Sequence, residues 1–233
     1  MRLDDFPRLL ETSSEQGDAM HGRLVTLSAW AWRAALVLLT VEVAAVSLFR
    51  YFAHIEAAPP PVVANAFANP FLIIHVAAGV SALVLGPLQF VRRIRERSPS
   101  LHRTIGLTYV SACALSAPAA FMLALGTTAG PVAGGGFAAL ALLLAVFTSL
   151  GLHAAWQRRF KAHREWMLRS YALTATAITL RLMLPAAGLL GLEFLTSYQV
   201  IAWLSWITNL ALIELHIRRT RVRLAPRAMQ ALA

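Results

Sequence analysis

The sequence has few of the features that a secreted or soluble domain of its length needs. Only 14% of its 233 residues are charged, and a single cysteine, Cys113, excludes an internal disulfide bond. Motifs of several enzyme classes are missing: the HExxH zinc site, the GxSxG nucleophile, the Walker loop and the GxGxxG dinucleotide turn. What remains is a chain that is 58% hydrophobic, and this composition favours an integral membrane protein.

Six apolar stretches are long enough to cross a bilayer as helices. A hydrocarbon core of about 30 Å takes roughly 20 apolar residues in helical form, because unpaired backbone groups are costly in lipid. The stretches lie near residues 34–52, 71–91, 104–126, 137–156, 167–190 and 200–215. Proline and glycine mark the breaks at 57–61, 69–70 and 130–136, and Gly134-Gly135-Gly136 is expected to form an external turn. The sequence therefore predicts an all-α polytopic transmembrane bundle of about six spans.

The basic residues predict how this bundle is oriented. Lysine and arginine gather in the N-terminal segment, in the loops after the second and fourth spans, and in the C-terminal tail. Only Arg50 and Arg181, of 21 basic residues, lie elsewhere. Because positively charged loops stay in the cytoplasm, both termini are expected there. The predicted organisation is a cytoplasmic tail (1–33), a transmembrane domain (34–216) and a basic cytoplasmic tail (217–233).

The same charge pattern bears on the partners of the protein. A formal net charge of +10 would suggest nucleic acid if the basic side chains formed one continuous soluble face. They lie instead in short clusters between apolar runs, so nucleic acid is not an expected partner. The basic loops are expected to contact membrane lipids, anionic lipid in particular. Assembly into a homo-oligomer or a larger membrane complex stays open.

Three groups of motifs carry a resemblance to a known family. They are HVAAG (75–79) with LGPLQF (85–90), LHRTIGLTY (101–109), and HREWMLRSYALT (163–174) with TLRL (179–182). Together they cover about residues 70–185 and resemble a family of bacterial multi-pass membrane proteins, the domain of unknown function 2306. The resemblance implies a topology, a set of recurrent polar positions and a place in the bacterial cytoplasmic (inner) membrane. It implies no reaction, since the family's activity is not assigned.

Polar side chains inside the predicted spans are the candidate functional residues, because placing them in lipid is costly. On the second span His75 and Gln89 share a helix face with Gly79 and Gly86, which would let another helix or a flat ligand approach closely. For His75 the alternatives are a ligand contact and a hydrogen bond between helices. The candidates for ligand binding or a polar core are His75, Gln89, Tyr109, Glu42, Arg181 and Arg169.

Arg181 needs a partner within the bundle. It lies about fourteen residues into the fifth helix, or roughly 20 Å, which is too deep for its side chain to reach the cytoplasmic surface. Glu42 on the first span lies at a similar depth and is the expected partner. Such a pair is either structural or part of a site for an anionic substrate or a quinone head. Glu214 is expected to form a solvated ion pair with Arg218 or Arg219 beside it.

The histidines raise haem as a cofactor. A haem with two histidine ligands needs them on facing helices at matching depth. His153, together with His102 or His163, meets this requirement on the cytoplasmic side, so these three residues are the candidate ligands of haem iron. His75 lies toward the outer end of its helix, where His54 is the nearest candidate partner. The alternative is that His102 and His163 anchor their helices at the interface.

Three functions are consistent with these residues. The first is a membrane protein that binds haem b or carries out redox chemistry through inward-facing histidines. The second is a transporter or receptor for a small molecule or lipid, and the third is a structural membrane subunit without a cofactor. The sequence assigns no catalytic residue, and enzyme activity stays undecided.

Overall fold

The computed structural model describes residues 34–54 and 60–230, and every regular element of this part of the chain is a helix. The chain divides into two compact units, Met1–Glu42 and Val43–Ala233. The predicted N-terminal tail (1–33) lies outside the described residues. Among the described residues, six helical segments are long and apolar enough to cross a membrane, which confirms the predicted all-α bundle of six spans.

The helices extend beyond the predicted apolar stretches at most of their ends. The first candidate span is Ala34–Ala53, which closes with the π-helical turn η2 (Phe49–Ala53). The remaining elements are α2 (Pro60–Val63), α3 (Ala68–Leu85), η4 (Pro87–Phe90), α4 (Arg92–Arg97), α5 (Pro99–Leu125), α6 (Pro131–Trp156), α7 (Phe160–Thr174), α8 (Thr176–Leu189) and α9 (Phe194–Gln230). Pro99 and Pro131 begin α5 and α6, where proline is well tolerated because the first N–H groups of a helix have no partner within it. Since α9 reaches Gln230, most of the predicted C-terminal tail continues the last helix.

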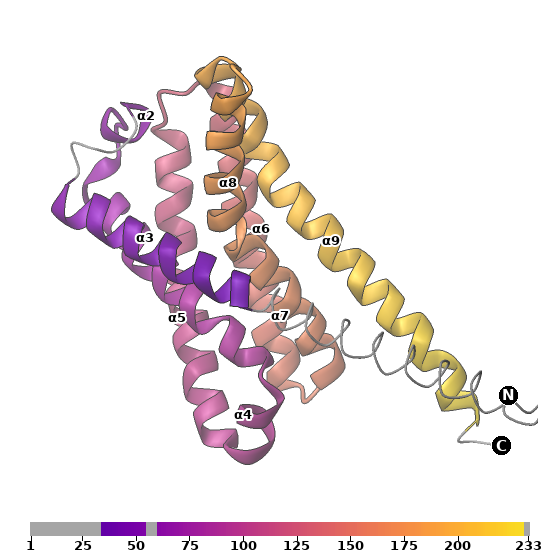
Figure 1. Ribbon diagram of the computed structural model, residues 1–233. Coiled ribbons are helices and arrows are strands. Elements are labelled where there is room, and N and C mark those ends of the chain that lie inside the picture. Colours follow the sequence, from indigo (N-terminus) through magenta and orange to yellow (C-terminus); the bar gives the residue numbers. More distant parts are fainter. Residues whose placement is uncertain (1–33, 55–59, 231–233) are drawn as a thin grey trace, which may run out of the picture. The chain divides into compact units, whose positions relative to one another are not determined.

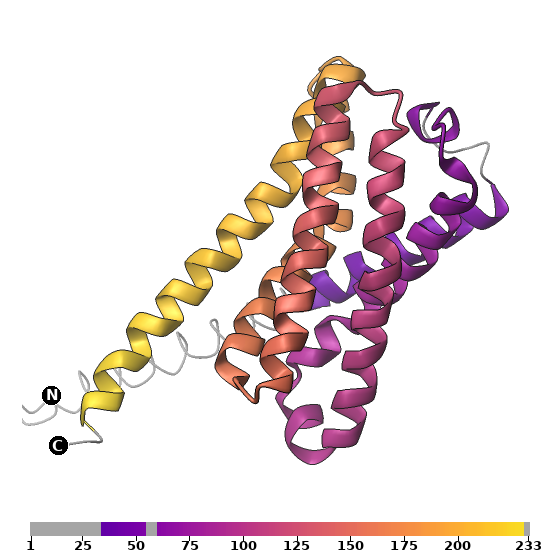
Figure 2. The same ribbon diagram turned by 180° about the vertical axis from the view of Figure 1, so that it is seen from behind.

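The second unit is built from helices that pack on their neighbours in the chain. α3 packs on α5, α5 on α6, and α6 on α7, while α9 contacts α6, α7 and α8. Figure 1 and Figure 2 show α5 and α6 side by side and antiparallel. Leu83, Tyr109 and Leu173 are buried inside this unit, whereas Leu115 and Leu142 point outward. Large apolar side chains on the outer surface are expected where helices face lipid.

The predicted external turn at Gly134-Gly135-Gly136 is wrong, because these residues lie in the first turns of α6. Their lack of a side chain serves helix packing instead. A Cβ atom on Gly134 would lie 2.9 Å from the carbonyl oxygen of Ala124, and one on Gly136 would lie 2.9 Å from that of Ala202. These two glycines therefore let α6 approach α5 and α9 closely.

The fifth candidate span, Phe160–Leu189, is interrupted by a single residue. α7 ends at Thr174 and α8 begins at Thr176. The N–H of Ala175 still donates to the carbonyl of Tyr171 (2.8 Å), and the carbonyl of Ala175 accepts from Ile178 (2.9 Å). The backbone thus stays hydrogen-bonded through the interruption, as a lipid environment requires.

Candidate ligand-binding cavity

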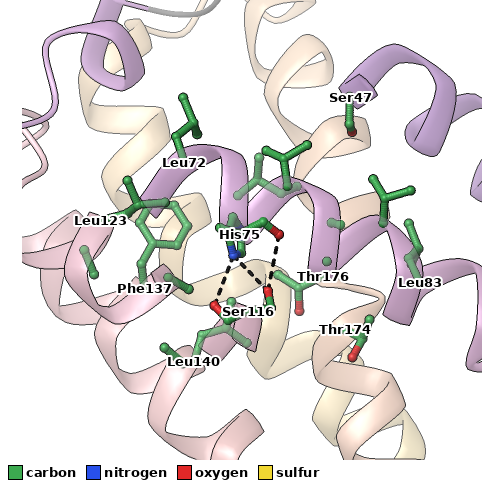
Figure 3. A pocket seen from close by; sticks show the side chains of 18 of the residues that line it. Ser47, Leu72, His75, Leu83, Ser116, Leu123, Phe137, Leu140, Thr174 and Thr176 are labelled. Carbon is green, nitrogen blue, oxygen red and sulfur yellow. Dashed lines mark hydrogen bonds between the residues drawn. The ribbon is translucent and has the colours of Figure 1, made fainter. Parts of the chain in front are cut away.

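A cavity of about 330 Å³ lies inside the second unit, between α3, α5, α6, α8 and the end of the first span (Figure 3). Most of its wall is apolar and includes Leu72, Leu123, Phe137 and Leu140. Polar side chains also line it: Ser47, His75, Ser116, Thr174, Thr176 and Arg181. Pockets that hold small molecules measure roughly 300–1,000 Å³, so this cavity is large enough for a small ligand.

His75 reaches this cavity from α3 and forms hydrogen bonds with Ser116 on α5. Its Nδ1 atom lies 2.9 Å from the hydroxyl oxygen of Ser116 and 3.3 Å from the carbonyl oxygen of the same residue. The Ser116 hydroxyl in turn donates to the carbonyl oxygen of His75 (3.4 Å), and Figure 3 draws all three bonds. Gly79 leaves room for this arrangement, since a Cβ atom there would lie 3.5 Å from the Ser116 hydroxyl. His75 therefore joins two helices and also lines the cavity.

Arg181 lines the cavity from α8. Its guanidinium group donates to the hydroxyl of Ser47 (2.7 Å) and to the carbonyl of Ala177 one turn earlier (3.1 Å). Ser47 donates its own proton to the carbonyl of Val43. The charged side chain is thus held toward the end of the first span. Glu42, the predicted partner, belongs to the other unit, and the Glu42–Arg181 pair stays a prediction.

A chain of buried hydroxyl groups borders the cavity. The hydroxyl of Tyr109, a residue that is only 1% exposed, lies 2.8 Å from that of Ser170 and 3.1 Å from that of Thr174. Ser170 also contacts the hydroxyl of Thr148 (2.7 Å), so the chain joins α5, α6 and α7. Tyr109 was identifiable from the sequence, whereas Thr148 stands in an apolar run without a motif. Thr176, in the cavity wall, is buried, and its hydroxyl oxygen has no hydrogen-bond partner within the described part of the chain.

Gln89 and Arg169 lie outside the cavity wall. The side chain of Gln89 covers Gly106 on α5, where a Cβ atom would lie 3.0 Å from its Oε1 atom. Arg169 on α7 forms an ion pair with Glu214 on α9, and its guanidinium group stacks over Trp166 at 4.7 Å. Glu214 therefore pairs across two helices, and the expected ion pair with an arginine that follows it on α9 is wrong.

The histidines of the haem prediction lie at the N-terminal ends of α5 and α7 and at the C-terminal end of α6. His163 donates from Nδ1 to the carbonyl of Gly151 (2.8 Å), and His102 lies near enough for the two imidazoles to interact electrostatically. His153 is exposed, and its Nε2 atom lies 2.7 Å from the side-chain amide nitrogen of Gln157. Across residues 34–54 and 60–230, no group of three or more histidine, cysteine, aspartate or glutamate side chains could hold a metal ion. A haem on His153 with His102 or His163 stays a prediction.

The chain is similar to a described family of proteins. No curated protein and no solved structure matches the chain. The family described as "Predicted membrane protein (DUF2306)" matches residues 72–217, which is more than half of the sequence. The matched segment begins within α3, ends within α9 and contains His75, Ser116, Thr176 and Arg181 of the cavity wall. The chain therefore belongs to the DUF2306 family of predicted membrane proteins.

Proposed function

We propose that this protein binds a small amphiphilic molecule from the bilayer and acts as a membrane receptor or transporter. The observation that carries the proposal is the cavity, which combines apolar walls with a polar cluster inside a bundle of candidate membrane spans. The apolar walls suit the hydrocarbon part of a ligand. His75, Ser116 and Arg181 suit its polar head, since polar groups in a membrane interior commonly mark binding sites.

The structural alternative is that these polar groups only hold the helices in register. The bonds from His75 to Ser116 and from Arg181 to Ser47 are compatible with it, because each joins two elements. Thr176 favours a ligand. It is 3% exposed, it lines the cavity, and its hydroxyl has no partner among the described residues. A buried hydroxyl without a partner costs about 1–3 kcal/mol, and a polar ligand in the cavity would remove this cost.

A cavity-filling variant tests the proposal. Ala120 on α5 lines the cavity, whereas Ala114 on the same helix is exposed on its outer surface. The protein and its Ala120→Phe and Ala114→Phe variants would be purified in a mild detergent, and the bound amphiphiles would be identified by native mass spectrometry. We expect a bound species in the wild type and in Ala114→Phe, and its loss in Ala120→Phe. Equal retention of that species by both variants would contradict binding in the cavity.

Haem b binding is the second candidate function, and it is favoured by one observation. Histidines that ligate a metal through Nε2 usually donate Nδ1–H to a carbonyl or carboxylate, as His163 does to the carbonyl of Gly151. In this case His163 would bind the iron together with His153. An absorption spectrum of purified protein, oxidised and then reduced with dithionite, tests the idea. A Soret band that disappears in His163→Ala is expected, and protein without bound iron would exclude this candidate.

We further propose that the protein resides in a bacterial cytoplasmic membrane with both termini inside. The distribution of arginine between alternate loops supports this orientation. The basic segments would then meet the anionic cytoplasmic leaflet, which attracts such clusters. A reporter domain that is active only in the cytoplasm should be active when it is fused to either terminus. Activity of a periplasm-specific reporter at either terminus would contradict the assignment.

A further inference from the structure

The hydrogen bonds of His75 restrict the chemistry of the ligand's head. We propose that this head is a hydroxyl group that donates a hydrogen bond to Nε2 of His75, so that the ligand is a long-chain alcohol or phenol. This inference rests on the proposed function, because it takes the cavity as the binding site. It excludes heads that only accept hydrogen bonds at this position, such as the carbonyl of a quinone or an ionised carboxylate.

Two carbonyl groups, those of Ser116 and His75, determine which atoms donate in the contacts between these two residues. Nδ1 lies 3.3 Å from the carbonyl oxygen of Ser116, and a carbonyl oxygen can only accept. The Ser116 hydroxyl lies 3.4 Å from the carbonyl oxygen of His75 and donates its only proton there. The contact of 2.9 Å between Nδ1 and the Ser116 hydroxyl oxygen then requires a proton on Nδ1.

In this assignment the single proton on Nδ1 is shared between the hydroxyl and carbonyl oxygens of Ser116, and the Ser116 proton goes to the carbonyl oxygen of His75, so each of the three contacts has a donor and an acceptor. The opposite tautomer would leave an unprotonated Nδ1 facing a carbonyl oxygen, and the Ser116 proton could satisfy only one of its two acceptors. Tautomers are assigned from such networks, and this network favours the neutral imidazole with Nδ1–H. Its Nε2 atom consequently carries a lone pair.

The lone pair on Nε2 is available to a ligand. Within the described residues, the side-chain hydrogen bonds of His75 are all made by Nδ1, and His75 lines the cavity. A hydroxyl group can donate to Nε2 and still accept through its own lone pairs. Arg181 supplies N–H groups to the same cavity wall, and Thr176 supplies a hydroxyl that can donate or accept. The hydroxyl group of an alcohol or phenol can therefore donate to Nε2 of His75 and accept from the donors on Arg181 or Thr176.

The size and polarity of the cavity agree with this class of ligand. A volume of about 330 Å³ is at the lower end of the range for ligand pockets, and the wall is mostly apolar. A neutral hydroxyl head also avoids the cost of taking an ionised group out of water, which is large in an apolar surrounding. The hydrocarbon chain would lie along Leu123, Phe137 and Leu140 in the wall.

The tautomer of His75 is the first test. Nitrogen-15 NMR of protein labelled at histidine, in lipid nanodiscs, distinguishes a protonated from an unprotonated ring nitrogen. The His75 signals are assigned by their loss in His75→Gln. We expect a neutral ring with the proton on Nδ1. A proton on Nε2 would overturn the inference and leave the proposed binding function untouched.

The second test compares two probes that differ in one proton. Dodecylphenol can donate a hydrogen bond, whereas its methyl ether cannot, and both have the same tail. We expect the phenol to bind at least about tenfold more tightly, because the ether leaves the buried acceptor unpaired. In His75→Leu the phenol and the ether should bind with nearly equal affinity. The preference for the phenol should persist in Ser81→Ala, a control on the same helix whose exposed hydroxyl donates to the carbonyl of Ala77.

The outcomes separate this inference from the proposal beneath it. If phenol and ether bind equally, and both lose binding in Ala120→Phe, the cavity is a binding site and the hydroxyl assignment is wrong. Tighter binding of a quinone or a fatty acid with the same tail would overturn the assignment in the same way. If no probe binds at any concentration below its micelle limit, the inference and the proposed function both fail.

Discussion

Replacing Gly86 with alanine should destabilise the bundle by about 1–2 kcal/mol. Gly86 follows α3 with helical backbone angles (φ −55°, ψ −50°), so alanine is not strained there. Its Cβ atom would, however, lie 2.2 Å and 2.4 Å from two ring carbons of Tyr171. Carbon atoms in contact stand about 3.5–4.0 Å apart, so the ring must move by more than 1 Å.

The surroundings of Tyr171 resist this movement. Its ring packs against Phe90 with 5.9 Å between centroids, and its hydroxyl donates to the carbonyl of Leu83 (3.4 Å). Overpacking of this kind costs about 1–3 kcal/mol, and the better helix propensity of alanine returns up to about 1 kcal/mol. Gly188 is the matched control, because a Cβ atom there meets nothing within 4 Å. Gly188→Ala should be neutral or stabilise by up to about 1 kcal/mol.

Thermal unfolding of both variants in one detergent measures the difference. Gly86→Ala should unfold at a lower temperature than the wild type, and Gly188→Ala at the same or a higher one. Combining Gly86→Ala with Tyr171→Leu should cost less than the sum of the two single changes, because the smaller side chain removes the clash. If Gly86→Ala is as stable as Gly188→Ala, the close packing of α3 against α7 is refuted.

Two further predictions concern polar groups. Ser170→Ala should lower the free energy of unfolding by about 1–2 kcal/mol, and Tyr109→Phe should lower it by about 1 kcal/mol or less. The difference arises because only the first change takes the hydroxyl partner from Thr148. Denaturation in sodium dodecyl sulfate measures both free energies, and a larger loss in Tyr109→Phe would contradict the network. Glu193 accepts the N–H groups of Leu195 and Thr196 at the start of α9, and these bonds lower the pKa of its carboxyl group. The carboxylate therefore stabilises the start of α9 fully above its ordinary pKa, and this stabilisation is lost as the pH falls through the lowered pKa. The hydrogen-exchange protection of these two N–H groups should consequently decrease in acid. Glu193→Gln should remove this dependence of the protection on pH.

The six spans were predictable because lipid imposes a simple rule on length and polarity. Long apolar runs, and the prolines that begin α5 and α6, are visible in the sequence without tertiary information. The interruption at Ala175 was not, since alanine favours a continuous helix. The helical run at Gly134–Gly136 was also missed, because its reason is the approach of α5 and α9, which only the packing reveals.

Part of the cavity could be recognised from the sequence, and part could not. His75 and Arg181 stood out as polar residues in apolar spans, and the structure places both in the cavity wall. The bond from Arg181 to Ser47 joins residues 134 positions apart, and serine in a membrane helix gives no signal of such a contact. The choice of Ser116 as the partner of His75 likewise depends on the crossing of α3 and α5, which helix periodicity does not define.

Photolabelling in native membranes would show whether an amphiphile occupies the cavity. A long-chain alcohol with a photoreactive group on its tail would be added, and the labelled residues would be identified by mass spectrometry. On α5 and α6, labelling should concentrate on Leu123 and Leu140 in the cavity wall, and an excess of unlabelled alcohol should suppress it. Labelling confined to Leu115 and Leu142, which lie exposed on the outer surface of the same helices, would contradict occupation of the cavity.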